Sequence, residues 1–342
     1  MDAQGVPYII ASSARESYPV VPFFGLLWTS ARNSVAIPMD YPLGGEWGDC
    51  LSEGMPLLPE NPFPEKMSLC WLSLLEKKFY VFEDKLDVEK IKEFYESLFS
   101  LDSSEIYFIL GMGPFGECAL WIKNSIKSEL ILTGFGQQSD LSLSTLFPVR
   151  PDLSVDEFCE MMLAQSGEGH ADEVLSVDDI KSRYKRYNYR LKIDYDKWED
   201  EAWKNLGKTQ YDLQMEDTKI RRFDGTFSKT EELFNFTPGS ILKKLSIKFN
   251  IGKTGFECCF FLDYEELRGI FERFYGAHPD TKSDFIVRMD PDKKKYELAL
   301  FRQGLREPVV IPESAYQLIV FKNKFEDYRS DNYSQPKGAW IW

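Results

Sequence analysis

The sequence predicts an α+β protein of two related lobes, each a mainly antiparallel sheet with a helix packed on one face. Two segments of the chain repeat the same order of apolar strands around one amphipathic helix. Each predicted helix follows an aspartate that can cap it. With 342 residues, of which 43% are hydrophobic, the chain can fill two cores.

The repeat relates residues 67–99 to residues 245–275. In both copies a first strand is followed by an aromatic strand, and we align Phe79–Phe82 of the first copy with Phe256–Cys259 of the second. A pattern shared by two such segments predicts two copies of one supersecondary unit.

One amphipathic helix is predicted in each copy. Asp87 and Asp263 stand where an N-cap oxygen accepts hydrogen bonds from the first free backbone amides of a helix. The apolar residues that follow recur at helical spacing and predict one buried stripe on each helix: Ile91, Phe94, Tyr95 and Leu98, then Leu267, Ile270, Phe271 and Phe274.

Beyond each helix, two alternating segments predict a pair of strands, IYFIL and ECALWI in the first copy and DFIVRM and YELALF in the second. A short apolar run follows each pair and predicts a further strand. The repeated unit is therefore strand, strand, helix, strand, strand, with one more strand after it.

The stretch GMGPFG, residues 111–116, has the Gly-x-Gly-x-x-Gly spacing of a dinucleotide-binding loop. In that fold the glycines open a helix whose backbone amides hold the phosphates. Here the strand ECALWI follows instead, so we interpret GMGPFG as a hairpin loop whose glycines serve the local backbone conformation. Nucleotide binding is not expected.

Composition along the chain places the N-terminal lobe at residues 1–165 and the C-terminal lobe at residues 182–342. Residues 166–181 are predicted to form an acidic connecting loop between them. The first 60 residues are rich in Pro, Gly and aromatics, and we expect irregular chain that packs by its aromatics. Ser154 or Asp156 can cap a short helix ahead of the connecting loop.

The formal net charge is −14. Nucleic-acid binding relies on Lys and Arg, so this charge argues against it and favours a basic protein partner; the alternative is that the charge serves solubility alone. The one basic, aromatic-rich run, residues 181–190, is interpreted as an amphipathic strand with a solvated face. Our candidates for contact with a partner are the carboxylates Asp172, Glu173, Asp178 and Asp179.

Neither metal nor cofactor binding is expected. The six cysteines lack paired metal-ligand spacing, and four lie in apolar, strand-like runs where a buried thiol is common. The two histidines, His170 and His278, have no second ligand at a suitable spacing. Carboxylates are plentiful, but no motif assigns two of them to one catalytic site, so no catalytic residue is named.

The predicted location is cytoplasmic. No segment approaches the roughly 20 apolar residues that span a bilayer, and the first residues lack the basic and apolar regions of a secretory leader. A periplasmic or lipid-anchored location would require a leader that has been removed.

The C-terminal segment carries large aromatics in a polar stretch that contains Pro and Gly. Exposed aromatics at a chain end would form a sticky patch, so we expect this tail to be ordered and to dock on the protein. Hydrogen bonds from Arg329 and Asn332 are expected to fix its path. The aromatic residues of the tail are Tyr328, Tyr333, Trp340 and Trp342.

Three motifs carry a resemblance to a bacterial family: a Ser-Leu-x-Glu-x-x-Phe-Tyr strand at Ser73–Tyr80, a hairpin ending in Trp at Gly113–Trp121, and Tyr-Arg-Ser-x-Asn-Tyr at Tyr328–Tyr333. On these motifs the chain resembles domain of unknown function family twenty-nine thirty-one, a group of uncharacterised proteins of which many are described as lipoproteins. The motifs lie within residues 66–91, 109–122 and 310–342.

The resemblance implies no established catalytic residues. It implies an association of some members with contact-dependent or type VI secretion loci, which suits an immunity protein that binds and blocks a toxin. The chain departs from the lipoprotein pattern because neither a signal peptide nor a lipid-accepting cysteine is found near Met1.

Our first hypothesis is therefore a noncatalytic protein-binding module, most concretely an immunity protein that neutralises an antibacterial effector of type VI secretion. Its acidic surface would orient a basic or mixed-charge toxin, and a few buried aromatics would supply most of the affinity. The alternative is an enzyme or small-ligand-binding protein that uses the groove between the lobes. A structural component of a secretion or surface assembly is a third hypothesis.

Overall fold

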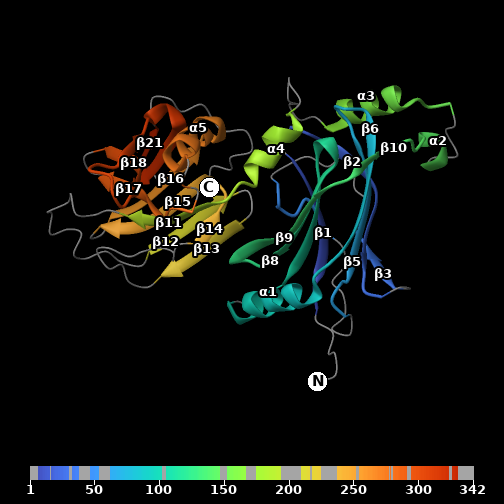
Figure 1. The fold of residues 1–342 in the computed structure, drawn as a ribbon, viewed down its shortest axis with the longest axis horizontal. Coiled ribbons are helices and arrows are strands. Elements are labelled where there is room, and N and C mark those ends of the chain that lie inside the picture. Colours follow the sequence, from blue (N-terminus) through green and yellow to red (C-terminus); the bar gives the residue numbers. More distant parts are fainter. Residues whose placement is uncertain are drawn as a thin grey trace. The chain divides into compact units, whose positions relative to one another are not determined.

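The chain divides into two compact units, residues 1–181 (unit 1) and residues 182–342 (unit 2). Mostly antiparallel strands with few helices build both units (Figure 1). The structure, a computed structural model, describes residues 7–15, 17–30, 33–37, 47–53, 62–101, 105–146, 152–166, 175–193, 209–215, 218–224, 237–251, 254–276, 278, 280–290, 294–322 and 326–329.

The first sheet of unit 1 has the strand order β9-β8-β7-β1-β4. Its neighbouring strands are antiparallel except β1 and β7, which are parallel. Because parallel neighbours need a long crossover, the chain builds most of a second sheet and a helix between them. The strands are β1 (Ile9–Ala14), β4 (Ser52–Glu53), β7 (Tyr107–Met112), β8 (Glu117–Lys123) and β9 (Lys127–Phe135).

The second sheet of unit 1 has the order β10-β6-β5-β2-β3 and is antiparallel. Its inner face meets the first sheet in the main core, where Trp71 packs with Phe108 and Leu120. The strands are β2 (Val20–Trp28), β3 (Ser34–Ala36), β5 (Lys66–Ser73), β6 (Lys78–Lys85) and β10 (Gln137–Ser139).

Helices cover two sides of unit 1. Helix α1 (Val88–Leu101) buries Ile91, Tyr95 and Leu98 in the main core. After the short α2 (Leu143–Leu146), helix α3 (Val155–Ser166) packs on the outer face of the second sheet, at the upper end of that sheet in Figure 1. Its buried side chains are Phe158, Cys159 and Met162.

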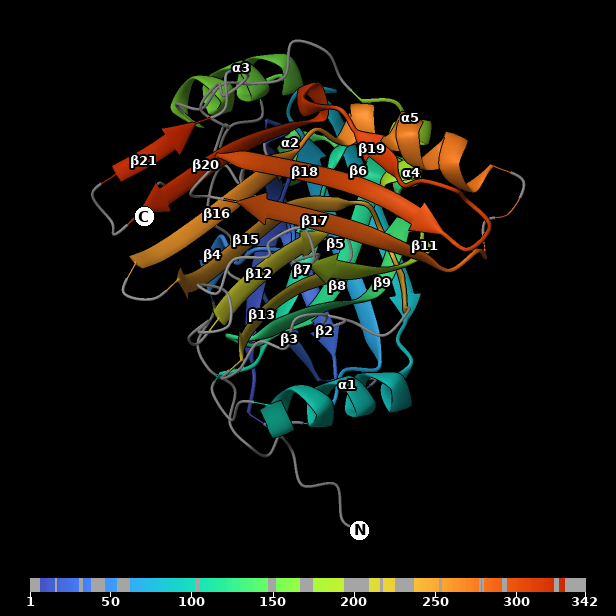
Figure 2. The ribbon, with the colours of Figure 1, turned by 90° about the vertical axis from the view of Figure 1, so that its left-hand side faces the viewer.

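Unit 2 also contains two sheets. One has the order β21-β20-β16-β15-β12-β13 and is antiparallel; the other has the order β14-β11-β17-β18-β19. Strands β11 and β17 are its parallel pair, and Figure 2 shows β17 and β18 as adjacent antiparallel arrows. The strands are β11 (Tyr187–Ile193), β12 (Thr209–Met215), β13 (Thr218–Asp224), β14 (Thr237–Gly239), β15 (Leu242–Ile251), β16 (Thr254–Leu262), β17 (Ser283–Asp290), β18 (Lys295–Arg302), β19 (Val309–Ile311), β20 (Tyr316–Lys322) and β21 (Glu326–Arg329).

Helix α5 (Tyr264–Tyr275) packs into the core of unit 2 and buries all four residues of its predicted stripe. The Asp263 side chain accepts a hydrogen bond from the backbone amide of Glu266 at 2.9 Å, which caps the helix. Asp87 accepts the equivalent bond from the amide of Lys90 at 3.1 Å. Both predicted N-caps are therefore confirmed.

Strand β19 is the last strand of its sheet and is only three residues long. It lies between Pro308 and Pro312, and it exposes Val309 and Val310.

The two units connect their strands in the same way. The chain runs through β1, β2, β5, β6, α1, β7, β8, β9 and β10 in unit 1, and through β11, β12, β15, β16, α5, β17, β18, β19 and β20 in unit 2. Counterpart strands also pair alike, since β1 with β7 and β11 with β17 are the parallel pairs. The predicted order of strand, strand, helix, strand, strand and a further strand is present in both units.

The prediction of irregular chain over the first 60 residues is wrong, because they contribute β1, β2, β3 and β4. Two prolines obscured the strand pattern of β2. The register of β2 against β5 shifts between Pro22 and Phe24. A β-bulge of this kind tolerates a proline, which cannot donate to the strand ladder.

Each unit contains two sheets rather than the single predicted sheet, because strands that precede the repeat join both sheets of each unit. The alignment of the aromatic strands is also one residue out. Tyr80 and Phe256 both face the core of their units, whereas Phe79 packs on the outer face. Since strand side chains alternate, a shift of one residue reverses the faces, and Tyr80 corresponds to Phe256.

Replacing Asp263 with Ala is expected to lower the free energy of unfolding of unit 2 by about 1 kcal/mol, because the amide of Glu266 loses its acceptor. Urea denaturation followed by circular dichroism measures this change. The exposed Asp280→Ala variant is the matched control and should unfold like the unmodified protein. Equal losses in the two variants would contradict the capping role.

Candidate functional site

The GMGPFG stretch joins β7 to β8 as a hairpin loop, as predicted, and a strand follows it rather than a helix. Its last glycine, Gly116, has a φ of +79°, and a Cβ there would lie 2.4 Å from the Gly136 carbonyl oxygen. A Cβ on Gly111 would lie 2.6 Å from the ring of Trp121. Gly116 is therefore required by its backbone conformation, and Gly111 by its close packing against the Trp121 ring.

The loop does hold an anion, but one from its own chain. The backbone amide of Phe115 donates to one carboxylate oxygen of Glu76 at 2.7 Å, and the hydroxyl of Tyr80 donates to the other at 2.7 Å. The indole of Trp71 donates to the carbonyl of Gly113 at 2.9 Å. Glu76 thus occupies the Phe115 amide that a phosphate would use. Since Glu76 and Trp71 come from the β5–β6 hairpin, these bonds connect the two sheets of unit 1.

A buried ion pair lies next to this loop. The guanidinium of Arg15, the residue after β1, donates two hydrogen bonds to the carboxylate of Glu117, the first residue of β8, at 2.5 and 2.6 Å. Their side chains are 5% and 1% exposed, and the ring of Trp47 lies 4.7 Å from the guanidinium carbon. The two charges neutralise each other away from water, so the pair is suited to holding the fold rather than to binding a ligand.

Sequence reasoning missed this pair. Its partners are separated by 102 residues, and the hairpin motif Gly113–Trp121 that contains Glu117 does not point to Arg15. The sequence feature that lies next to the pair is Gly113. A Cβ at this position would lie 2.6 Å from the Glu117 carboxylate.

The predicted partner-binding carboxylates fall partly on a helix. Helix α4 (Val177–Arg183) occupies the end of the predicted connecting loop, so that part of the prediction is wrong. A capping box explains the helix. The carboxylate of Asp179 accepts from the amide and the hydroxyl of Ser176 at 3.1 and 2.6 Å, and the amide of Asp179 donates to the Ser176 hydroxyl at 3.1 Å.

The structure therefore separates the four predicted carboxylates. Asp179 is engaged in the cap, whereas Asp178 is exposed on the first turn of α4. Asp172 and Glu173 lie outside the described residues. Of the four, Asp178 is the described carboxylate whose exposure leaves it accessible to a partner.

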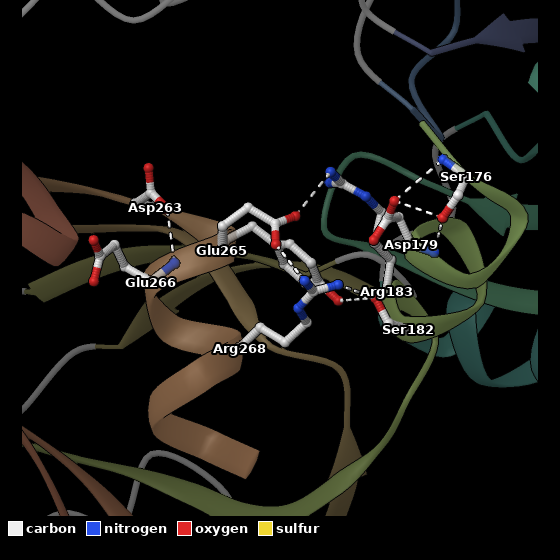
Figure 3. Close-up of polar contacts among 9 residues, drawn as sticks. Ser176, Asp179, Ser182, Arg183, Asp263, Glu265, Glu266 and Arg268 are labelled. Atoms are coloured by element: carbon white, nitrogen blue, oxygen red, sulfur yellow. Dashed lines mark hydrogen bonds and ion pairs between the residues drawn. The ribbon is translucent and has the colours of Figure 1, made fainter. Parts of the chain in front are cut away.

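The end of α4 is held by the start of α5 (Figure 3). The hydroxyl of Ser182 bonds the Tyr264 hydroxyl at 3.0 Å and accepts from Arg268 at 3.2 Å. Arg268 also pairs with Glu265 at 2.8 Å. The guanidinium carbon of Arg183 lies 4.5 Å from the Tyr264 ring centroid, and its nearest nitrogen lies 3.9 Å from Glu265.

These contacts decide the interpretation of the basic run 181–190. Residues 181–183 end α4, and the predicted strand begins only at Tyr187, with buried and half-buried side chains in alternation. Arg190 pairs with Asp284 of the neighbouring strand at 2.6 Å. Arg183 and Arg190 thus face carboxylates of their own unit, which opposes phosphate binding there.

Burial makes the described core thiols poor nucleophiles. Desolvation raises the pKa of Cys70 and of Cys259 to about 11 and that of Cys159 to about 12. It also raises the pKa of Cys118 and of Cys258 well above the usual value. These thiols stay protonated at neutral pH, and the thiolate is the reactive form.

Within the described ranges, no group of three or more His, Cys, Asp or Glu residues is arranged to hold a metal ion. No helix among the described residues is long and apolar enough to cross a membrane.

The outer face of the second sheet of unit 1 is only partly covered. Near α3, the side chains of Val21, Cys70 and Phe79 are buried beneath the helix. At the other end β2 turns Phe24, Leu26 and Trp28 outward; Phe24 is 39% exposed, and the other two are half-buried. We call these three residues the β2 stripe.

Polar neighbours fix Trp28 within the β2 stripe. Its indole donates to the Ser68 hydroxyl at 3.0 Å, and this hydroxyl donates to Glu83 at 3.2 Å. The ammonium of Lys66 lies 3.0 Å from Glu83 and 5.0 Å from the centroid of the Trp28 ring. The hydrogen bond from Lys66, followed by that from Ser68, lowers the pKa of Glu83.

The corresponding positions of unit 2 are polar. Leu26 and Trp28 pair with Ser68 and Lys66 of β5. The counterpart strand β12 places Asp212 opposite Ser246 and Gln214 opposite Lys244. The shared connectivity therefore does not require apolar residues at the β2 stripe.

The predicted C-terminal tail is described only at its start. Tyr328 and Arg329 belong to β21, where they pair with Val320 and Ile319. Asn332, Tyr333, Trp340 and Trp342 lie outside the described residues, so docking of the tail stays a prediction.

Comparison with known proteins identifies one family. Residues 44–204 match the family model described as protein of unknown function (DUF2931), which confirms the resemblance over this stretch. The match covers just under half of the chain and contains β5, β6 and the GMGPFG hairpin. It ends before the second copy of the repeat and before residues 310–342, where the resemblance stays a prediction. No curated protein and no solved structure gives a significant match.

Replacing Glu117 with Gln is expected to lower the free energy of unfolding by about 3–5 kcal/mol, because Arg15 keeps a buried charge without its partner. Urea denaturation of the full chain measures this loss. A double variant, Arg15→Met with Glu117→Leu, removes both charges and should recover part of it. A single variant as stable as the unmodified protein would show that the pair does not hold the fold.

The stability of unit 1 is expected to fall as the pH rises above 9. Burial raises the pKa of Cys159 from 9.0 to about 12, so the native state keeps a neutral thiol while the unfolded chain ionises. The stability that unit 1 gains from the neutral Cys159 thiol is fully present below pH 9 and is lost between pH 9 and 12. Unfolding free energies across this range should decline less steeply in Cys159→Ala; parallel curves would contradict the assignment.

Proposed function

Since residues 44–204 match the family model described as protein of unknown function (DUF2931), which names no activity, we propose that this chain is a noncatalytic protein-binding module. The β2 stripe is the observation that carries the proposal. Contiguous apolar groups with a polar rim on a soluble protein surface are typical of protein interaction sites. The polar residues at the matching positions of unit 2 support a role beyond the fold.

The side chains of the β2 stripe suit a protein partner. Tryptophan is among the residues that most often dominate binding energy at interfaces. The hydrogen bond from Trp28 to Ser68 and the proximity of Lys66 hold the indole in place before any partner arrives. A side chain that is already ordered loses little conformational entropy on binding, which favours affinity.

In its finer form, the proposed partner is an antibacterial effector of type VI secretion, and the chain is its cytoplasmic immunity protein. The net charge of −14 supports a basic or mixed-charge partner, because complementary charge speeds association and orients it. Glu83, whose side chain is 64% exposed, and Glu65, which is also exposed, add carboxylates beside the β2 stripe.

We also infer that units 1 and 2 are two copies of one ancestral repeat, with lobes at residues 1–165 and 182–342. The support is the common series of nine elements and the placement of the parallel pair at the same point in each series. Within this proposal one copy developed an apolar stripe and the other kept polar residues at the matching positions.

Replacing Phe24 with Ser is expected to weaken binding of the effector by at least tenfold, because an exposed apolar contact is lost while the fold keeps its core. Trp28→Ala should weaken binding further. Isothermal titration with the co-expressed product of the neighbouring gene measures both affinities.

The matched control is Phe99→Ser, which removes an aromatic of similar exposure on α1, and it should bind like the unmodified chain. Unchanged affinity in both stripe variants would exclude the β2 stripe as the interface. Failure of every neighbouring gene product to form a complex would overturn the proposed function itself. The alternative of an enzyme or a small-ligand-binding protein stays a prediction.

A further inference from the structure

The Trp28 end of the β2 stripe holds a cation between an aromatic ring and a carboxylate. Lys66 pairs with Trp28 across β2 and β5, and its ammonium lies 5.0 Å from the centroid of the indole ring and 3.0 Å from Glu83. Tryptophan is the side chain whose ring attracts cations most strongly, and a carboxylate adds the opposite charge. We call Trp28, Ser68 and Glu83 the cation subsite, which the chain fills with its own lysine.

A buried hydroxyl fixes the cation subsite. Ser68 is 5% exposed and pairs with Glu83 across β5 and β6. Its hydroxyl accepts from the indole of Trp28 at 3.0 Å and donates to Glu83 at 3.2 Å. Since the ring and the carboxylate are each bonded to Ser68, both keep this partner when the lysine leaves. The cation subsite is therefore built independently of the cation that occupies it.

The resident lysine is held weakly. The side chains of Lys66 and Glu83 are 32% and 64% exposed. An exposed ion pair contributes little to stability, because water screens it and two long side chains lose freedom. A guanidinium is less strongly hydrated than an ammonium, stacks on aromatic faces and pairs with a carboxylate through two parallel hydrogen bonds. An arginine thus suits the cation subsite better than the lysine that fills it.

Unit 2 shows that the fold does not impose this arrangement. By the repeat, Lys244 of β15 is the counterpart of Lys66. Lys244 lies 5.2 Å from the ring centroid of Phe261, whereas the carboxylate of Glu257 lies 3.3 Å from the ammonium of Lys248. The ring and the carboxylate serve two different lysines in unit 2, but they converge on one lysine in unit 1. This convergence supports a role in binding.

We propose that the cation subsite takes an arginine side chain of the protein partner, which replaces Lys66 over the Trp28 ring and pairs with Glu83. This inference rests on the proposed function and adds the chemical group that the partner presents. The net charge of −14 favours a basic partner, on which arginine is a main source of charge. Because Phe24 and Leu26 continue the stripe, the matching surface of the partner presents this arginine beside apolar side chains.

The test titrates the full chain with N-acetylarginine amide and follows the indole NMR signal of Trp28, which is identified by its loss in Trp28→Phe. Lys66→Ser empties the cation subsite and is expected to bind the probe about fivefold more tightly than the unmodified chain. Adding Glu83→Gln to Lys66→Ser should reverse this gain, because the carboxylate charge is lost. The neutral analogue N-acetylcitrulline amide should leave the Trp28 signal unchanged.

Lys85→Ser is the matched control. Lys85 pairs with Lys66 across β5 and β6, and its replacement changes the net charge by the same amount. This variant should bind the probe like the unmodified chain. Equal gains in the two lysine variants would overturn the proposal, because net charge alone would explain them. An unresponsive Trp28 signal in Lys66→Ser, or equal responses to the arginine and citrulline probes, would also overturn it.

The probe acts without any partner, so its result is separate from the proposed function. Failure of every neighbouring gene product to form a complex would overturn the proposed function and leave the probe result standing. Where a complex forms, Lys66→Ser should bind the effector about threefold more tightly, because the competing lysine is removed. A loss of affinity would instead show that Lys66 itself contacts the effector, and it would overturn the proposed replacement.

Discussion

The ion pair between Arg15 and Glu117 is the interaction around which unit 1 is organised. Two charges in a dry interior are tolerated only when each satisfies the other, and the bidentate geometry does so at 2.5 and 2.6 Å. The pair fixes the end of β1 against the start of β8. It also favours a glycine at position 113, because a Cβ there would lie 2.6 Å from the Glu117 carboxylate.

From this point the contacts spread to the second sheet. The indole of Trp71 in β5 donates to the carbonyl of Gly113, and Glu76 of the β5–β6 turn accepts from the backbone amide of Phe115. Hydrogen bonds therefore join the two sheets of unit 1 at this corner, in addition to the apolar packing of the main core. The loop with dinucleotide-like glycine spacing thus links the two sheets by hydrogen bonds. The conformational freedom of glycine serves a turn here rather than a phosphate site.

Much of the element order follows from local sequence, and the sheets do not. Asp87, Asp263 and the apolar stripes after them define the helices, because caps and helical spacing are encoded within a few residues. The division into two sheets depends on which strands pair across long distances, and no local pattern states it. Strand β2 contains Pro22, which a strand tolerates here because the register against β5 shifts at this point. The ion pair and the β2 stripe were the hardest features to predict from the sequence. Arg15 and Glu117 meet across 102 residues, and the residues of the β2 stripe resemble those of any apolar strand.

Strand β19 bears on how the protein behaves at high concentration. Exposed valines at the edge of a sheet invite another molecule to add a strand, which is a common start of aggregation. Here Pro308 and Pro312 bracket the strand, and a proline has no amide hydrogen to offer. A strand from another molecule could therefore pair with only three residues before it meets a proline on either side. The apolar edge can thus remain in water without becoming a template for fibres.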